Sequence, residues 1–140
     1  MPSSSRHLAR RTAVQALYQW EVTGQGGDTI EQSFIPNPAL SGRHREYFQK
    51  LILNIPRSIS EIDSALAPFH NRDPQRVDLI ENAILRLGTY ELMYELDIPV
   101  NVVIDEAVSL AKTYSSANSY RYVNGVLDKV AHKTRGRNRG

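Results

Sequence analysis

Apolar side chains recur at helical spacing through most of this 140-residue sequence. The longest example runs from Phe48 to Phe69, where apolar residues are separated by three, four or seven positions. No segment shows the alternation of apolar and polar residues that is typical of a strand between two turns. We therefore expect an all-α fold of six to seven helices, arranged as two packed helical subdomains.

Glycine and proline residues divide the first half of this pattern. Gly24 to Gly27 end a first helix, and a short helix follows Asp28 and stops before Pro36. The helical phase continues across Pro56. This continuity indicates either one long helix kinked at Pro56 or two nearly collinear helices, the second with Pro56 in its first turn.

The second half contains the most apolar helix, which we expect from about Pro74 to Glu95 with Asp73 as its cap. It is apolar on nearly all sides, which is typical of a central helix. Gly88 lies inside it, at a cost of about 1 kcal/mol relative to alanine. We therefore expect another backbone to approach Gly88 closely.

Two more helices are expected, one capped by Asn101 and one that starts at Ser119. The length suits one domain, 1–140, with helical subdomains at about 1–70 and 74–133. The basic tail, about 133–140, is expected to be disordered by itself.

The composition and motifs argue against an enzyme. Cysteine is absent, which excludes disulfides and thiolate metal sites. The sequence contains neither a phosphate-binding loop nor a nucleophile elbow. We expect no cofactor and no metal, a cytoplasmic protein and no membrane span. The four histidines are never at metal-ligand spacing from one another: His7, His44, His70 and His132.

Charge is distributed unevenly along the chain. Residues 1–23 carry a net charge of +2, residues 112–140 carry +6, and the residues between them carry −6. Two basic ends around an acidic middle suggest two surfaces with different partners, although a solvated surface can also segregate its charges in this way.

Both basic ends combine cations with aromatic rings, which single-stranded RNA needs for its phosphates and unpaired bases. In the last helix, Arg121 lies between Tyr120 and Tyr122. The alternative that Tyr18 and Tyr122 are half-buried at the edge of the core stays open. In the first helix the candidates are Arg6, His7, Arg10 and Arg11, with Tyr18 on the same exposed stripe as Arg6, Arg10 and Val14.

Three segments resemble the bacterial NusB family of transcription antitermination factors. They are AVQALYQW at 13–20, AILRLGTYEL at 83–92 and YVNGVLDK at 122–129. The third is close to the family's (F/Y)VNGVLDK, and the resemblance extends from about residue 6 to 131. The Gly125 of this motif also has a structural interpretation, which we favour: it lets two helices pack closely.

The resemblance implies two helical bundles and a specific role. NusB-like proteins pair with NusE, a small ribosomal protein, and bind the boxA element of nascent ribosomal RNA. They then help RNA polymerase to pass terminators, in a complex that includes NusA and NusG. Relatives occur as monomers or dimers, so a homodimer stays an open alternative.

The resemblance also assigns residues by position. RNA contacts are expected at Arg6, Arg10 and Tyr18, with His7 and Arg11 nearby, and at Tyr122 next to Arg121. NusE contacts are expected at Phe69, Arg72 and Glu81, although Glu81 can also be a plain surface charge. Asn118 stands where several relatives carry an acid, and His7 where some carry arginine.

Two further functions compete with this one. An adaptor that binds only proteins would keep its RNA affinity unchanged when the arginines and tyrosines are removed. A small enzyme would show a polar pocket with perturbed titrating groups. The fold of the family also occurs in certain ribosomal RNA cytosine methyltransferases, but the sequence ends before a cofactor-binding domain, so we expect a different protein.

Overall fold

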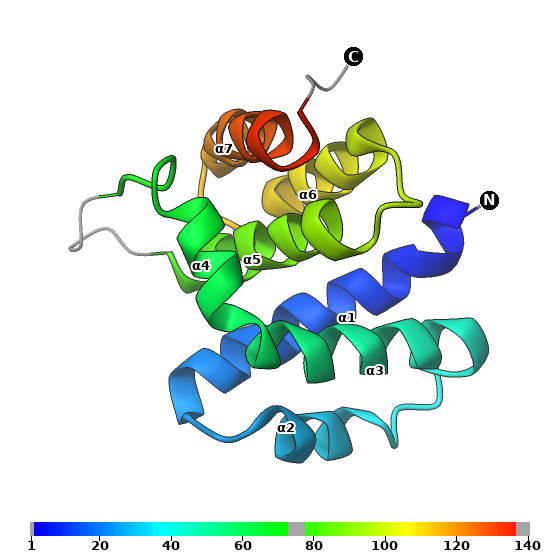
Figure 1. Ribbon diagram of the computed structural model, residues 1–140. Helices are drawn as coiled ribbons and strands as arrows, with labels where there is room; N and C mark the ends of the chain where they lie inside the picture. The colour runs from blue at the N-terminus through cyan, green and yellow to red at the C-terminus, as the bar shows by residue number, and fades with distance from the viewer. Residues whose placement is uncertain (1, 73–77, 137–140) are drawn as a thin grey trace. The chain divides into compact units, whose positions relative to one another are not determined.

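The computed structural model describes residues 2–72 and 78–136, with side chains from residue 6 onward. This part of the chain forms seven helices and no strand, which confirms the all-α prediction. Backbone contacts divide the chain into two compact units, residues 1–58 and 59–140. The subdomain boundary that the sequence predicts at about 70–74 therefore does not coincide with this division between Ser58 and Ile59. Figure 1 labels the helices of both units.

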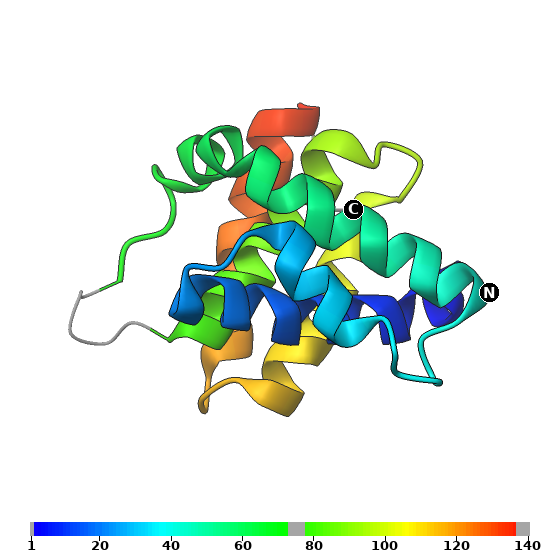
Figure 2. The same ribbon diagram turned by 90° about the horizontal axis from the view of Figure 1, so that it is seen from below.

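The N-terminal unit contains three helices, α1 (Pro2–Thr23), α2 (Gly27–Phe34) and α3 (Gly42–Arg57). Helices α1 and α3, which run in the same general direction, make the main contact of this unit, and α2 packs against both (Figures 1 and 2). Its core consists of small and aliphatic residues of α1 against the apolar face of α3: Ala9, Ala13, Ala16, Leu17, Phe48, Leu51, Ile52 and Ile55.

Of the two expected arrangements, a single kinked helix is wrong and two separate helices are observed, but Pro56 lies in the last turn of the first helix, α3, instead of the first turn of the second. The break falls at Ser58, whose φ of −107° and ψ of 18° leave the helical region. Its N–H still donates to the carbonyls of Asn54 and Ile55. A proline is tolerated here because it removes only one hydrogen bond, near the helix end. The next helix, α4, spans Ile59–Leu66.

The C-terminal unit contains α4, α5 (Leu79–Tyr94), α6 (Val100–Tyr114) and α7 (Ser119–Arg135). The last three helices pack pairwise, and α4 lies against α5 and α7 (Figure 1). Residues of α5 are buried on almost every side, as its sequence predicts.

Helix α5 begins at Leu79, five residues later than the sequence suggests. Asp78 is its N-cap, since its Oδ1 accepts hydrogen bonds from the N–H groups of Ile80 and Glu81, both at 3.0 Å. The predicted start, with Asp73 as cap, lies outside the described residues. Helix α6, in contrast, begins earlier than expected, with Pro99 instead of Asn101 at the cap position.

Gly88 of α5 is approached closely, but by a side chain instead of the expected backbone. A Cβ added to Gly88 would lie 2.7 Å from Cδ1 of Leu127 on α7. This contact lets α5 and α7 come together over a glycine.

Helix α7 starts at Ser119 as predicted and continues through Arg135, so residues 133–135 of the expected disordered tail are helical. Arg135 explains this extension, because its guanidinium donates to the carbonyls of Glu91, Leu92, Glu95 and Ile98 at 2.6 to 3.1 Å. Two of these carbonyls, those of Glu91 and Glu95, also accept a backbone N–H, from Glu95 and Ile98, so Arg135 is their second donor. Residues 137–140 of the tail lie outside the described residues.

Candidate nucleic-acid and partner interface

The candidates on α1 belong to the N-terminal unit, and the structure separates them by exposure. Tyr18 is 40% exposed, whereas Arg6, His7 and Arg11 are partly covered. The guanidinium of Arg6 lies over the ring of Tyr47 on α3, 4.6 Å from its centre. A cation over an aromatic face is held in place while it keeps its charge.

Arg10 departs from the expected exposed stripe, because it is 1% exposed. Val14, one turn further on, is also buried. The guanidinium of Arg10 lies 5.8 Å from the centre of the Tyr47 ring, on the same ring as Arg6. A larger part of the surface of α1 is therefore buried than its small-residue face alone predicts. Of the predicted stripe of Arg6, Arg10, Val14 and Tyr18, Tyr18 is the exposed member.

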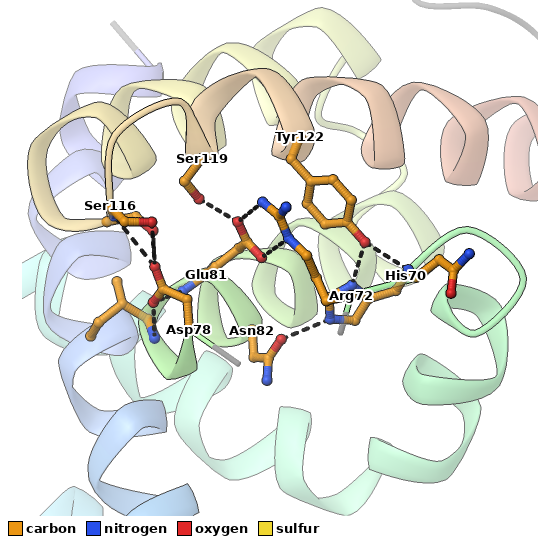
Figure 3. Close-up of polar contacts among 11 residues, drawn as sticks. His70, Arg72, Asp78, Glu81, Asn82, Ser116, Ser119 and Tyr122 are labelled. Carbon is orange, nitrogen blue, oxygen red and sulfur yellow. Dashed lines mark hydrogen bonds and ion pairs between the residues drawn. The ribbon is translucent and has the colours of Figure 1, made fainter. Parts of the chain in front are cut away.

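Tyr122, on the first turns of α7, is the centre of a polar cluster in the C-terminal unit (Figure 3). Its hydroxyl oxygen accepts a hydrogen bond from the N–H of Asn71 at 2.7 Å and lies 2.8 Å from Nδ1 of His70. Nε2 of the same imidazole lies 2.7 Å from Oδ1 of Asn82 on α5. Since an amide oxygen only accepts, Nε2 of His70 donates the hydrogen bond to Asn82.

Arg72 covers one face of the same tyrosine. Its guanidinium lies 3.8 Å from the centre of the Tyr122 ring and forms a bidentate pair with Glu81, at 2.8 and 3.1 Å. The Arg72 side chain is 37% exposed, whereas Glu81 is 1% exposed. Ser119 donates a further hydrogen bond to Glu81 at 2.5 Å. Glu81 is therefore an internal anchor for Arg72 and α7, and the plain surface charge that we left open as an alternative is wrong.

Asp78 joins the start of α5 to the turn between α6 and α7. While its Oδ1 caps α5, its Oδ2 accepts from the Ser115 hydroxyl at 2.6 Å and from the N–H and hydroxyl of Ser116 (Figure 3). The turn ends at Asn118, which has a φ of 68°. Asparagine is one of the few residues other than glycine that adopt this left-handed conformation readily. The turn thus fixes the position of Tyr122 relative to α5.

These contacts shift the pKa values of three groups. Hydrogen bonding to Glu81 raises the pKa of Arg72. Burial alone would raise the pKa of Asp78, but hydrogen bonds from Ser115, the Glu81 N–H and Ser116 outweigh it and lower that pKa. Burial raises the pKa of Tyr122, so its hydroxyl keeps its proton at neutral pH.

The structure therefore brings together Arg72, Glu81 and Tyr122, which the resemblance assigned to two different partners. Phe69 lies just before this cluster, with the ammonium of Lys133 5.9 Å from its ring centre. Arg121 is exposed and does not join the cluster. Sequence reasoning missed five of its members, for which no motif gave a signal: His70, Asn71, Asp78, Asn82 and Ser119.

Gly125 lies in the middle of α7, one turn after Tyr122. A Cβ added at Gly125 would meet no atom within 4 Å, in contrast to Gly88. Our interpretation that Gly125 lets helices pack closely is therefore wrong. A helical glycine without a close neighbour costs stability relative to alanine and gains no packing in return.

Among the described residues, no group of three or more His, Asp or Glu side chains could hold a metal ion. No described helix is long and apolar enough to cross a membrane. Fold and site together define an all-α protein that places tyrosines and cations together on its helices, as nucleic-acid and protein binders do.

Comparison with known proteins identifies the family. The NusB family model matches residues 7–132. The transcription antitermination protein NusB of Mannheimia succiniciproducens is 45% identical over 128 residues, which cover 91% of this chain and 90% of that protein. The protein of the same description from Nitrosococcus oceani is 44% identical, over 95% of this chain and 89% of its own length.

Solved structures agree with this result. A T. maritima NusB structure has a TM-score of 0.78 at 32% identity, and covers 91% of both chains. A crystal structure of antitermination factors NusB and NusE in complex with dsRNA has a TM-score of 0.81 at 29% identity, over 93% of this chain and 98% of that one. The chain belongs to the NusB family of transcription antitermination proteins, which are regulators of transcription and not enzymes.

Proposed function

We propose that this protein pairs with NusE, binds the boxA element of nascent ribosomal RNA, and helps RNA polymerase to pass terminators. The observation that carries this proposal is the similarity, over 93% of the chain, to a NusB solved together with NusE and dsRNA. The cation and tyrosine clusters on α1 and α7 are consistent with it.

The proposal gives the cations and the tyrosines of the two clusters different tasks. Arg6, Arg11 and Arg121 supply positive charge, which positions a nucleic acid through its phosphates and reads no sequence, and His7 lies beside Arg6 in the sequence. Arg10 is 1% exposed, so it adds charge to this surface without reaching a phosphate. Tyr18 and Tyr122 supply rings on which unpaired bases stack. Tyr18 is the better exposed of the two, at 40%. Tyr122 uses one face for Arg72, so a base would stack on its other face.

The NusE contact is proposed at Phe69 and Arg72, with Glu81 in a supporting role. Glu81 is buried and bidentate to Arg72, so it acts on a partner by fixing the Arg72 guanidinium. The complex with NusA, NusG and RNA polymerase belongs to the same proposal, as do the homodimer and the cytoplasmic location.

Fluorescence anisotropy with labelled RNA tests the proposal directly. The RNAs are single-stranded boxA, a scrambled strand of equal length and a boxA duplex, each with and without purified NusE at fixed salt. We expect single-stranded boxA to bind most tightly, and NusE to tighten that binding further. Equal affinity for boxA and the scrambled strand in the presence of NusE would contradict the proposal and favour a protein adaptor.

A further inference from the structure

A second tyrosine at the start of α7 has two cations beside it, and neither cation forms an ion pair within the part of the chain that the structure describes. The ammonium of Lys112, in the last turn of α6, lies 4.9 Å from the centre of the Tyr120 ring. The guanidinium of Arg121 lies 5.6 Å from the same centre, and its Nε donates to the Tyr120 hydroxyl at 3.1 Å. One ring therefore holds a positive charge from α6 and another from α7.

The charge of this group is uncompensated. Lys112 and Arg121 are both exposed, and neither has an ion-pair partner in residues 2–72 or 78–136. The turn that separates them in sequence, 115–118, is fixed by Asp78 through Ser115 and Ser116. Two like charges next to each other repel, so a structure that holds them together is favoured when an anion lies between them.

The position of the group on α7 separates it from the Tyr122 cluster. Successive residues of an α-helix are rotated by about 100°, so Tyr120 and Tyr122 point to nearly opposite sides of α7. The Tyr122 side is occupied by Arg72, His70 and Asn71. The Tyr120 ring is contacted by the two cations Lys112 and Arg121.

We propose that Lys112, Tyr120 and Arg121 form a phosphate clamp for single-stranded RNA. Lys112 and Arg121 bind phosphodiester groups, and Tyr120 is a positioning residue that aligns both cations. The proposal rests on the proposed function and adds a second RNA segment, which passes over the start of α7 on the side away from Tyr122. Because these contacts go to phosphates, they strengthen the binding of every RNA sequence alike.

A simpler interpretation gives Lys112 a structural role. A lysine in the last turn of a helix interacts favourably with the helix dipole, by about 0.3–1 kcal/mol. Under that interpretation, the loss of Lys112 lowers the unfolding temperature and leaves RNA binding unchanged. The test must therefore measure RNA binding and stability on the same variants.

The test measures the salt dependence of RNA binding for Lys112→Ala, Tyr120→Ala and Arg121→Ala. For single strands, the slope of log K against log salt is about −0.7 per phosphate contact. We expect Lys112→Ala and Arg121→Ala each to reduce the slope by about 0.7, and to weaken boxA and scrambled RNA equally, by about twofold to fivefold. Arg45→Ala, which removes an exposed cation from α3, is the matched control and leaves the slope unchanged.

Tyr120→Ala distinguishes a clamp from two independent cations, because it removes no charge. We expect it to reduce the slope, and we expect its effect to disappear in a Lys112→Ala, Arg121→Ala background. Tyr120→Phe keeps the ring and restores most of the slope. Unchanged slopes in all three alanine variants overturn the clamp, and so does a loss that affects NusE binding but not RNA binding.

The scrambled strand keeps this result separate from the proposed function. If the unmodified protein binds boxA and the scrambled strand equally, the proposed function fails, while the clamp is still measured on both strands. If the unmodified protein prefers boxA and the alanine variants have the same salt dependence as the unmodified protein, the clamp is contradicted and the proposed function is not. If no RNA binds, both proposals are overturned.

Discussion

Two tyrosines, two residues apart on α7, have the same type of partner and opposite surroundings. Tyr122 stacks with Arg72, whose charge is neutralised by the buried Glu81, and its hydroxyl contacts His70 and Asn71. Tyr120 contacts Lys112 and Arg121, which have no acid beside them among the described residues. A cation over an aromatic ring thus stabilises the fold when an acid neutralises its charge. When no acid does so, the charge of the cation stays available for a ligand.

We expect the largest effect on stability from Glu81→Ala, which removes the acid that neutralises Arg72. It leaves Arg72 without its bidentate partner and Ser119 without its acceptor. Removing one partner of a buried pair is strongly destabilising, and with Arg72 partly exposed we expect a loss of about 3 kcal/mol in the free energy of unfolding. Urea denaturation measures it.

Asp63→Ala is the matched control for that variant. Asp63 also forms a bidentate pair, with Arg86, but its side chain is 46% exposed. An exposed pair contributes about 1 kcal/mol or less. Equal losses in the two variants would show that the burial of Glu81 has no special role.

The next prediction is that Tyr122 and Tyr120 differ in whether their loss depends on the RNA sequence. We expect Tyr122→Ala to weaken boxA RNA by about 1–3 kcal/mol, which is the contribution of a stacked base, and to weaken scrambled RNA less. We expect Tyr120→Ala to weaken both RNAs equally. Anisotropy titrations at one salt concentration check both variants. A uniform loss for Tyr122→Ala would contradict the assignment of stacking to Tyr122.

Gly88 and Gly125 allow a second comparison, between a helical glycine with a close neighbour and one without. We expect Gly88→Ala to destabilise the protein by about 1–3 kcal/mol, because its Cβ would lie 2.7 Å from Leu127. We expect Gly125→Ala to stabilise it by about 0.5–1 kcal/mol, since the site is open and alanine favours a helix. Thermal unfolding gives both signs. If Gly125→Ala keeps stability but weakens NusE or RNA binding, the open site is a contact for that partner.

A further effect of similar size concerns Asp78, which fixes the turn that both tyrosines follow. The pKa of Asp78 is lowered in the folded protein, so its contribution is complete above the unfolded pKa of about 3.9 and is lost as the pH falls through the folded value. Asp78→Asn keeps the cap oxygen but loses the acceptor for the Ser116 N–H. We expect a loss of about 1 kcal/mol at pH 7. The difference between the two proteins should shrink below about pH 4, as urea denaturation at several pH values would show.

Local sequence was enough to predict features that depend on neighbouring residues. The start of α7 at Ser119 and the burial of the apolar face of α3 both follow from spacing and residue type. The prediction for Gly88 is confirmed only in part, because the atom that approaches it closely belongs to the side chain of Leu127 and not to a backbone. The all-α fold follows from the same periodicity.

Features that depend on distant residues could not be predicted. The burial of Arg10 requires Tyr47, 37 positions later, and Glu81 becomes internal because Arg72 and Ser119 reach it from different segments. A helical stripe of arginines indicates which side they occupy, but the packing of another helix decides their exposure. The interpretation of Gly125 failed for the opposite reason, because no helix packs there.

Arg135 has a consequence for the order in which the C-terminal unit is completed during synthesis. Its acceptors, from Glu91 to Ile98, lie 37 to 44 positions earlier in the chain. While the ribosome adds the residues between them, the end of α5 and the turn before α6 lack the guanidinium that joins them to α7. One arginine then gives a donor to four backbone oxygens, two of which already accept a backbone N–H, so this connection forms only after Arg135 has been added.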